Sequence, residues 1–271
     1  MTVLEEAITS PIPIVKKAIY AIGRPMVAMF PVDTSQEIQV GERIHRVIAN
    51  ELRGRLDPPG PDLDYVRAVG TRVASHVRRR DITYTFHLVE IQEANAFTHA
   101  GGHIYLFRGL YSHMKNEAQL ACLLGHEIAH EDLMHTQDMV KPVAAVRRIQ
   151  STFPGAHVDL VRLITGLATL SMHLAYSEPR ELEADALGMR LAFEASYDPR
   201  EAIALYLEAG AYDSPKTRTN GTDLALQSHP NRLARVAALN KNVEELFEEH
   251  PFGPKIIGIE AFRKKHPIKA L

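Results

Sequence analysis

The stretch Gly125–His130 constrains this chain most, because it sets two histidines four residues apart inside an apolar run. Between residues 118 and 133, leucine, isoleucine and alanine recur at helical spacing, which predicts a buried helix. On that helix His126 and His130 point the same way. Their imidazoles can then grip one Zn²⁺ ion, while Glu127 reaches a water on the metal. A helix with a solvated polar face is the plainer interpretation, but these groups would be costly to bury unpaired.

A third ligand has to support this pattern, since a chain with 14 histidines can match it by chance. Ser177 can cap a new helix whose first turn contains Glu181, and Asp185 lies on the same face one turn later. Glu181 can complete the two-histidine, one-glutamate set of a catalytic zinc site. Asp185 can accept the spare ring N–H of His126 or His130. A glutamate at a helix start also suits the helix dipole alone, but next to the histidine motif the ligand interpretation is favoured.

Composition limits the class of protein and its partners. Apolar residues make up 45% and charged residues 24%, which is ordinary for a soluble protein with a sizeable core. The formal net charge of −2 and the pI near 6.7 leave no basic footprint, so nucleic acid is not expected as a partner. Cys122 is the single cysteine, so neither an intrachain disulfide nor a cysteine zinc site can form. The compartment stays open on these grounds.

The first residues give no convincing targeting signal. Residues 18–30 are apolar, but a glycine and a proline interrupt them and they fall short of the ~20 residues that a bilayer span needs. Glu5 and Glu6 precede Lys16-Lys17, and the apolar run after the lysines is short, which makes a poor secretory signal. We predict an N-terminal arm over residues 1–32, with residues 1–31 as a candidate for membrane-surface association. The main domain is predicted over residues 33–250 and a C-terminal tail over residues 251–271.

The hydrophobic pattern between the arm and the motif changes from helical to alternating. It predicts a helix capped near Asp33 and a second helix after a proline-rich turn at residues 57–61. Residues 82–89 alternate and are rich in β-branched and aromatic side chains, as in a strand. Residues 95–98 and 103–107 predict two more strands joined by a hairpin. Further helices are predicted over residues 139–151, 158–176 and 200–209 and from about residue 230 onward.

This order of elements predicts an α+β fold, mainly helical and zincin-like, with a small sheet of three or more strands beside the motif helix. In such folds an edge strand can hold an extended peptide by main-chain hydrogen bonds across the metal. The candidate substrate strand consists of Asn95, Ala96, Phe97 and Thr98. A plain structural hairpin fits the same residues.

The histidines outside the motif receive no firm role from the sequence. We expect them to be ordinary polar or core residues, as listed here: His87, His99, His103, His113 and His173. Two of them, His99 and His103, flank the candidate substrate strand closely enough to touch a peptide.

Taken together, the motifs resemble one family of metallopeptidases. In chain order the matching pieces are Gln36-Glu37-Ile38 with Gly41, Asn95-Ala96-Phe97 with Gly101-Gly102 and Gly109-Leu110, Gly125 to His130 with His135, Ser177, Glu181, Ala184-Asp185 and Gly188, Tyr197-Asp198-Pro199, and His229-Pro230 with Arg235. They span roughly residues 33–240, and their order is far more specific than the histidine motif alone. The chain thus resembles the HtpX-like and CAAX-prenyl-endopeptidase-like zinc metallopeptidases, and within them the soluble BepA- and LoiP-like branch.

The resemblance implies a gluzincin peptidase with one Zn²⁺ ion held by His126, His130 and Glu181 and with Glu127 as the general base. It also implies that His229 lies near the metal, where it caps the site or contacts the reaction oxyanion. Arg235 is implied nearby, so both are carried as candidate catalytic residues.

Two departures from the family pattern leave this ligand set intact. The usual Ser-Arg before the third ligand is Ser177-Glu178 here, which changes the charge beside the cleft, and the usual Ala-Gly before Tyr-Asp-Pro is Ala195-Ser196. The membrane-spanning helices of the HtpX and CAAX branches are not found in this sequence. The resemblance implies a periplasmic or membrane-associated protein. If the resemblance is set aside, a cytoplasmic protein is expected, because the sequence contains no convincing signal peptide or transmembrane helix.

We therefore expect a zinc-dependent metalloendopeptidase, a hydrolase whose polypeptide substrates are misfolded or unfolded proteins. The alternative is a latent or non-hydrolytic zinc protein that binds extended chains like a chaperone, with its site gated by His229 or by a loop over residues 210–228. A zinc-free helical scaffold is a third interpretation. The first two share every ligand, and the sequence does not give the substrate, the cleavage preference or the oligomeric state.

Overall fold

The computed structural model describes residues 31–152, 159–172, 176–211, 232–251, 256–260 and 262. The first two described helices begin as their sequences predict. Helix α4 (Thr34–Glu51) starts with a capping box, in which the Asp33 carboxylate accepts the backbone N–H of Gln36 at 2.8 Å and the Gln36 side chain reaches back. Helix α5 (Pro61–Ala74) starts at a proline, whose missing N–H costs nothing in the first turn. Both predicted helices are confirmed.

Three strands form a mixed sheet at the centre of the molecule. They are β1 (Thr85–Val89), β2 (Ala96–His99) and β3 (His103–Phe107), in the order β1-β3-β2. Strands β2 and β3 form the predicted antiparallel hairpin, whose turn uses positive φ angles of 91° at Gly101 and 81° at Gly102. Strand β1 pairs with β3 in parallel, with His87 opposite Tyr105. Strand β2 is therefore an edge strand within the described sheet.

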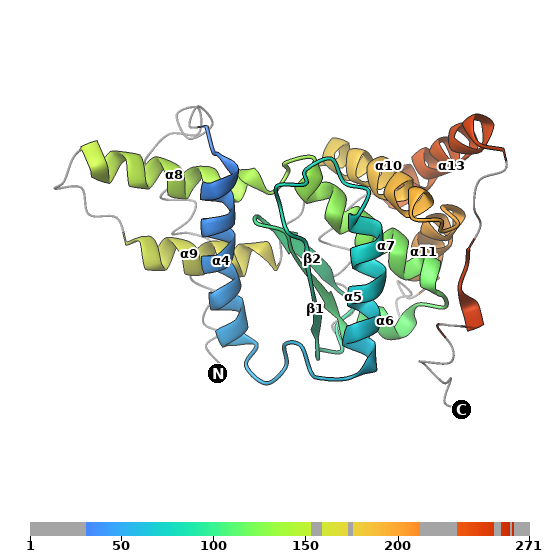
Figure 1. The fold of residues 1–271 in the computed structure, drawn as a ribbon, viewed down its shortest axis with the longest axis horizontal. Coiled ribbons are helices and arrows are strands. Elements are labelled where there is room, and N and C mark those ends of the chain that lie inside the picture. The colour runs from blue at the N-terminus through green and yellow to red at the C-terminus, as the bar shows by residue number, and fades with distance from the viewer. Residues whose placement is uncertain are drawn as a thin grey trace.

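The two faces of the sheet enter different hydrophobic clusters. Phe86, Leu88 and Ile104 point towards α5 and the motif helix α7 (Glu117–Asp132). Their neighbours along the strands, such as Val89 and Tyr105, point towards α4 and the helices beside it. Figure 1 shows the sheet between these two groups of helices. The predicted α+β fold, mainly helical with a small sheet beside the motif helix, is confirmed.

The remaining described helices complete the two groups. They are α6 (Arg108–His113), α8 (Gln137–Thr152), α9 (Leu160–Ser171), α10 (Glu178–Glu194), α11 (Arg200–Ala211) and α13 (Arg232–Glu249). Helices α8 and α9 pack with α4, whereas α10 and α11 pack on α7, and α13 packs on α10 and α11. Within the described residues α9 is shorter than the predicted helix over residues 158–176.

Close backbone contacts set the position of two helices. A Cβ atom at Gly41 of α4 would stand 2.0 Å from the carbonyl oxygen of Ala100 in the hairpin turn. A Cβ atom at Gly125 of α7 would stand 2.5 Å from the carbonyl oxygen of Gly188 on α10. Only glycine permits such approaches without displacing the neighbouring element.

The chain ends are described in part. Residues 1–30 lie outside the described residues, and with them nearly all of the predicted N-terminal arm. In the segment predicted as a C-terminal tail, Ile256 bridges to Tyr197, the carbonyl of Ile257 accepts the N–H of Ala118, and Phe262 is buried against the core. Part of that segment therefore packs on the main domain.

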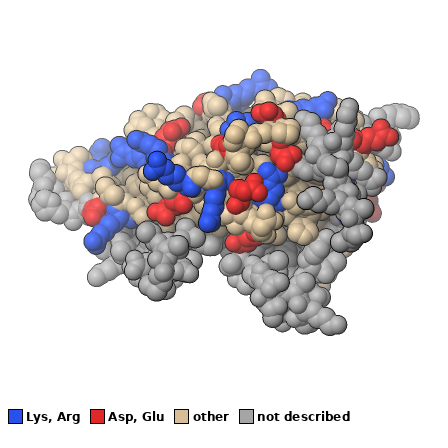
Figure 2. Space-filling view, turned by 90° about the horizontal axis from the view of Figure 1, so that it is seen from below, with Lys and Arg blue, Asp and Glu red and all other residues tan. Residues whose placement is uncertain are grey.

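The described surface carries both signs of charge. Seen from below, Lys and Arg side chains alternate with Asp and Glu over the described part of that face (Figure 2). None of the helices in the described ranges is long and apolar enough to cross a membrane.

Candidate metal centre

The motif helix α7 holds both predicted histidine ligands in the interior. Asn116 caps it by accepting the N–H of Gln119 at 2.8 Å, and nearly all its side chains are buried. Because His126 and His130 are one turn apart, their Nε2 atoms lie 3.1 Å from each other. The two rings stand almost perpendicular, at 83°. Their edges therefore converge on one point.

Glu181 reaches the same point from the first turn of α10. The close approach of α10 to α7 at Gly125 and Gly188 brings its carboxylate next to both rings. One Glu181 oxygen lies 3.5 Å from His126 Nε2 and the other lies 3.7 Å from His130 Nε2. We call His126, His130 and Glu181 the motif cluster; one ligand atom from each lies within 4.8 Å of the others. Ser177 is the N-cap residue as predicted, but its side chain does not make a capping hydrogen bond.

Nδ1 of each ring, the outer nitrogen, is held by a hydrogen bond. Nε2 of each ring, the inner nitrogen, is then left with a lone pair that can bind a metal. His126 Nδ1 donates to Asp185 at 2.9 Å. His135 donates its Nε2–H to Glu183 at 3.1 Å, so its Nδ1 can accept from His130 Nδ1 at 3.0 Å. Both inner Nε2 atoms then present lone pairs to each other. A cation between them relieves that repulsion.

The spacing of this donor set fits zinc. Two ligands bound to one tetrahedral zinc at about 2.0–2.1 Å lie about 3.3 Å from each other. The observed separations of 3.1, 3.5 and 3.7 Å bracket that value. Two neutral imidazoles with one carboxylate are also a set that leaves a fourth position for water or substrate.

A buried guanidinium ties the carboxylates of the site together. Arg235 of α13 is fully buried, and it donates two hydrogen bonds to Asp185 at 2.6 and 2.7 Å. A third nitrogen lies 3.0 Å from Glu181. Tyr206 of α11 hydrogen-bonds to Asp185 at 3.0 Å and to Arg235, which lies over its ring. Arg235 thus contacts Glu181, the third ligand, and Asp185, which holds the ring of His126.

The charges of this network follow from its contacts. Burial alone raises the pKa of Asp185, but the hydrogen bonds from Arg235 and His126 outweigh it and hold this pKa well below its ordinary value. Burial lowers the pKa of Arg235, yet Tyr206, Asp185 and Glu181 together raise it above its ordinary value. The carboxylate and the guanidinium are therefore both charged at neutral pH, as a buried pair needs to be.

Two further side chains complete the surroundings of the motif cluster. Glu127 is buried beside the ligands on α7. Tyr176 stacks on His130 with ring centroids 4.0 Å apart. Among the described residues its buried hydroxyl has no hydrogen-bond partner, and burial together with the charge of Glu127 raises its pKa well above the ordinary value. No local spacing links Tyr176 or Tyr206 to the motif, so the sequence alone assigns neither of them to the site.

Other predicted site residues are placed in part. His229 and most of the predicted loop over residues 210–228 lie outside the described residues. The candidate substrate strand forms β2 with Asn95 just before it, and its side chains are buried beside α7. His99 is also buried, and its two ring nitrogens are hydrogen-bonded to the carbonyl of Ala100 and the hydroxyl of Tyr105.

Comparison with known proteins agrees with this geometry. The model of peptidase family M48 matches residues 62–243, about two thirds of the chain. The mitochondrial metalloendopeptidase OMA1 of Schizosaccharomyces pombe is 28% identical over 216 residues, which cover 79% of this chain and 61% of that protein. The beta-barrel assembly-enhancing protease of Escherichia coli is 26% identical over 223 residues, 78% of this chain and 44% of that protein. The chain thus spans about half the length of the curated relatives it matches.

Proposed function

The chain belongs to peptidase family M48, and from this premise we propose that it is a zinc-dependent metalloendopeptidase that hydrolyses peptide bonds in unfolded or misfolded proteins. The observation that carries the proposal is the motif cluster with Glu127 beside it. Two inward-facing imidazole lone pairs and a buried carboxylate suit one zinc ion, with His126, His130 and Glu181 as its ligands.

The chemistry divides between the ion and the protein. A bound zinc ion supplies Lewis acidity towards a peptide carbonyl and a water molecule. Glu127 accepts a proton from the attacking water as the new C–O bond forms, and passes it to the amine nitrogen as the C–N bond breaks. The raised pKa of Tyr176 keeps its hydroxyl protonated, so it can donate a hydrogen bond to a substrate oxygen.

Arg235 and Asp185 act as positioning residues in this proposal. Asp185 holds the His126 ring by its Nδ1–H, and Arg235 holds both Asp185 and Glu181. Such contacts outside the ligands fix ring orientation and ligand basicity. The resemblance adds two further candidate roles: Arg235 as a catalytic residue, and His229 as a cap of the site or a contact of the reaction oxyanion.

The finer assignments rest on the resemblance. Membership of the HtpX-like and CAAX-like group, and of its BepA- and LoiP-like branch, is a proposal, as is a substrate strand at β2. The names of the two relatives place one in mitochondria and link the other to assembly of beta-barrels. For this chain we propose only that the substrates are extended polypeptides, which β2 can pair with as an edge strand.

The test compares Glu127→Gln with Glu194→Gln, which makes the same carboxylate-to-amide change at an exposed position of α10. Glu127→Gln should keep its zinc and its fold but lose 10²–10⁴-fold or more in the rate of hydrolysis of unfolded casein. Glu194→Gln should retain the wild-type rate. Metal analysis, circular dichroism and the casein assay give the three readouts. Activity that persists in Glu127→Gln contradicts the proposed general base.

The non-hydrolytic alternative predicts a different outcome of the same assay. Wild-type protein that contains zinc, binds unfolded casein and cleaves none of it, with or without a chelator, is a binding protein instead of a peptidase. If replacing His229 then releases hydrolysis, the site is latent.

A further inference from the structure

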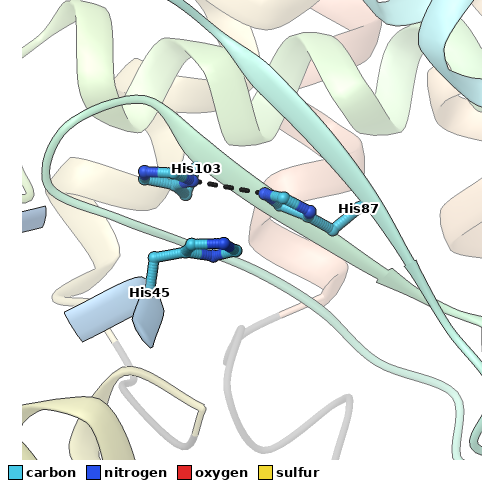
Figure 3. A group of neighbouring side chains, drawn as sticks. All are labelled: His45, His87 and His103. Carbon is cyan, nitrogen blue, oxygen red and sulfur yellow. Dashed lines mark hydrogen bonds between the residues drawn. The ribbon is translucent and has the colours of Figure 1, made fainter. Parts of the chain in front are cut away.

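A second group of histidines lies on the other face of the sheet. His45 comes from α4, His87 from β1 and His103 from β3, and one nitrogen of each lies within 4.8 Å of the others. Figure 3 shows the rings of His87 and His103 edge to edge, with the ring of His45 beneath both. We call these three residues the α4–sheet cluster. The parallel register of β1 and β3 brings the two strand histidines to the same face.

Each ring has an outer partner that occupies one of its nitrogens. Asp57 lies 2.8 Å from Nδ1 of His87, Tyr105 Oη lies 2.7 Å from Nδ1 of His45, and Glu42 lies 3.5 Å from Nε2 of His103. Metal-binding histidines typically have such a carboxylate or hydroxyl on the outer nitrogen. The nitrogens left to face inward are His87 Nε2, His103 Nδ1 and the second ring nitrogen of His45.

A chain of hydrogen bonds fixes the tautomer of His45. His99 must donate its Nδ1–H to the carbonyl of Ala100 at 2.9 Å, because a carbonyl only accepts. Its other nitrogen then accepts from the Tyr105 hydroxyl at 3.1 Å. The Tyr105 oxygen in turn accepts the Nδ1–H of His45, which leaves Nε2 of His45 as an electron-pair donor.

The two strand histidines share a hydrogen bond between Nε2 of His87 and Nδ1 of His103, 3.2 Å apart (Figure 3). Asp57 is an acceptor, so His87 carries its proton on Nδ1 and has a lone pair on Nε2. When His103 directs its own N–H at Glu42, its Nδ1 also has a lone pair, 3.2 Å from Nε2 of His87. That separation matches the roughly 3.3 Å between two nitrogens on one tetrahedral zinc. With His103 in that tautomer, a bridging cation can take the place of the hydrogen bond between the two nitrogens.

Hydrogen bonds hold the outer carboxylate of Asp57 in place. One oxygen accepts the backbone N–H of Leu88 at 3.0 Å, and the other lies 2.8 Å from Nδ1 of His87. The φ angle of Asp57 is 51°, a left-handed conformation that aspartate adopts more readily than most residues. The carboxylate therefore fixes the orientation of the His87 ring.

We propose that His45, His87 and His103 form a second metal site, which binds a divalent transition-metal ion and joins α4 to the sheet. Three imidazoles without a carboxylate or a thiolate select zinc and its neighbours over calcium or magnesium. His87 and His103 are buried, whereas His45 is partly exposed. The ring of His45 can therefore turn from its stacked position to point its Nε2 at the ion, and a water completes the coordination.

Zinc stoichiometry of the full chain tests this proposal. Metal-free protein is titrated with Zn²⁺ by calorimetry, and we expect two equivalents for the wild type. His45→Phe keeps an aromatic ring stacked on its neighbours but has no donor nitrogen, so it should bind one equivalent. The control is His113→Ala, an exposed histidine outside both clusters, which should still bind two. Should His45→Phe fail to fold by circular dichroism, His103→Gln serves as the second variant.

The outcomes separate this site from the motif cluster. His45→Phe should hydrolyse casein at the wild-type rate, since it leaves the motif cluster intact. Cobalt(II) added to Glu127→Gln should show the visible absorption of two tetrahedral sites, and the His45→Phe change should remove one of them. The proposal is overturned if His45→Phe and His103→Gln bind as much zinc as the wild type, whether the wild type binds one equivalent or two. A single equivalent that both variants lose would instead contradict the zinc site at the motif cluster.

Discussion

The motif cluster and the α4–sheet cluster lie on opposite faces of one three-stranded sheet, and they are built on different plans. The first joins two helices, has nearly perpendicular histidine rings and contains a carboxylate next to a buried arginine. The second joins a helix to two strands, and its rings are close to parallel, at 7° between His45 and His103. Its members are all imidazoles.

This difference indicates different tasks. Perpendicular rings already aim their nitrogens at one point, so the motif cluster is organised for an ion before one arrives. Stacked rings have to turn before they can bind an ion. The α4–sheet cluster therefore becomes ordered only when the ion binds, as expected of a structural metal site. Both sites nevertheless share two devices: an aspartate on an outer ring nitrogen, and a glycine that lets backbones touch nearby.

The largest expected contrast concerns the arginines of the two sites. Arg235→Met leaves Asp185 buried without its guanidinium, which should lower the free energy of unfolding by about 3–5 kcal/mol. Arg67→Met removes the partner of Asp57, but that pair is partly exposed and should contribute about 1 kcal/mol at most. Denaturant unfolding measures both. Equal losses would show that the two sites depend on buried charge to the same degree.

The glycine contacts should act selectively on their own clusters. A Cβ at Gly188 would stand 2.5 Å from the backbone nitrogen of His126, so Gly188→Ala should move α10 and carry Glu181 away from the histidines. Gly41→Ala should instead push α4 off the hairpin. We expect each to destabilise the fold by about 1–3 kcal/mol. Casein hydrolysis should fall in Gly188→Ala and be largely kept in Gly41→Ala; the reverse pattern contradicts the assignment.

The outer aspartates offer a matched pair of substitutions. Asp185→Asn and Asp57→Asn each keep the size of the side chain but weaken its hold on one ring. Each should reduce zinc affinity at its own cluster by about 10–100-fold and leave the other equivalent unchanged. Competition with a coloured chelator resolves the two affinities. A single substitution that weakens both equivalents alike would point to one shared site.

The smallest expected difference between the two clusters concerns how readily a chelator removes their zinc ions. The motif cluster offers an anionic ligand in a buried setting, whereas His45 is partly exposed. A chelator should therefore remove zinc from the α4–sheet cluster first, with affinities about tenfold apart, or about 1.4 kcal/mol. Loss of casein hydrolysis should follow the second ion to leave. Activity lost with the first ion would reverse the order that we infer.

The helices and strands were predictable wherever local spacing carries the signal. The capping box at Asp33, the alternation in β1 and the glycine turn after β2 all form as expected, and the helical order around the motif is confirmed. Two ligands four residues apart on a helix are visible in the same way. To predict Glu181 as the third ligand, it is enough to recognise the start of one further helix, α10.

What could not be predicted depends on contacts between distant segments. We expected His87 and His103 to be ordinary residues and gave His45 no role. Their meeting depends on the direct parallel pairing of β1 with β3, two strands that β2 separates in the sequence, and no local pattern specifies that pairing. In the same way, the pairing of Arg235 with Asp185 depends on the packing of α13 on α10. The sequence around either residue does not indicate it.

Synthesis runs from the N-terminus, and this gives the location of the α4–sheet cluster a consequence in time. Its last member, His103, leaves the ribosome 78 residues ahead of Glu181, from position 103 to position 181. At roughly 5–20 residues per second, that is a lead of roughly 4–16 s for the nascent chain. Helix α4 and the sheet can thus come together while the motif cluster still lacks Glu181, so the α4–sheet cluster can assemble first on the nascent chain.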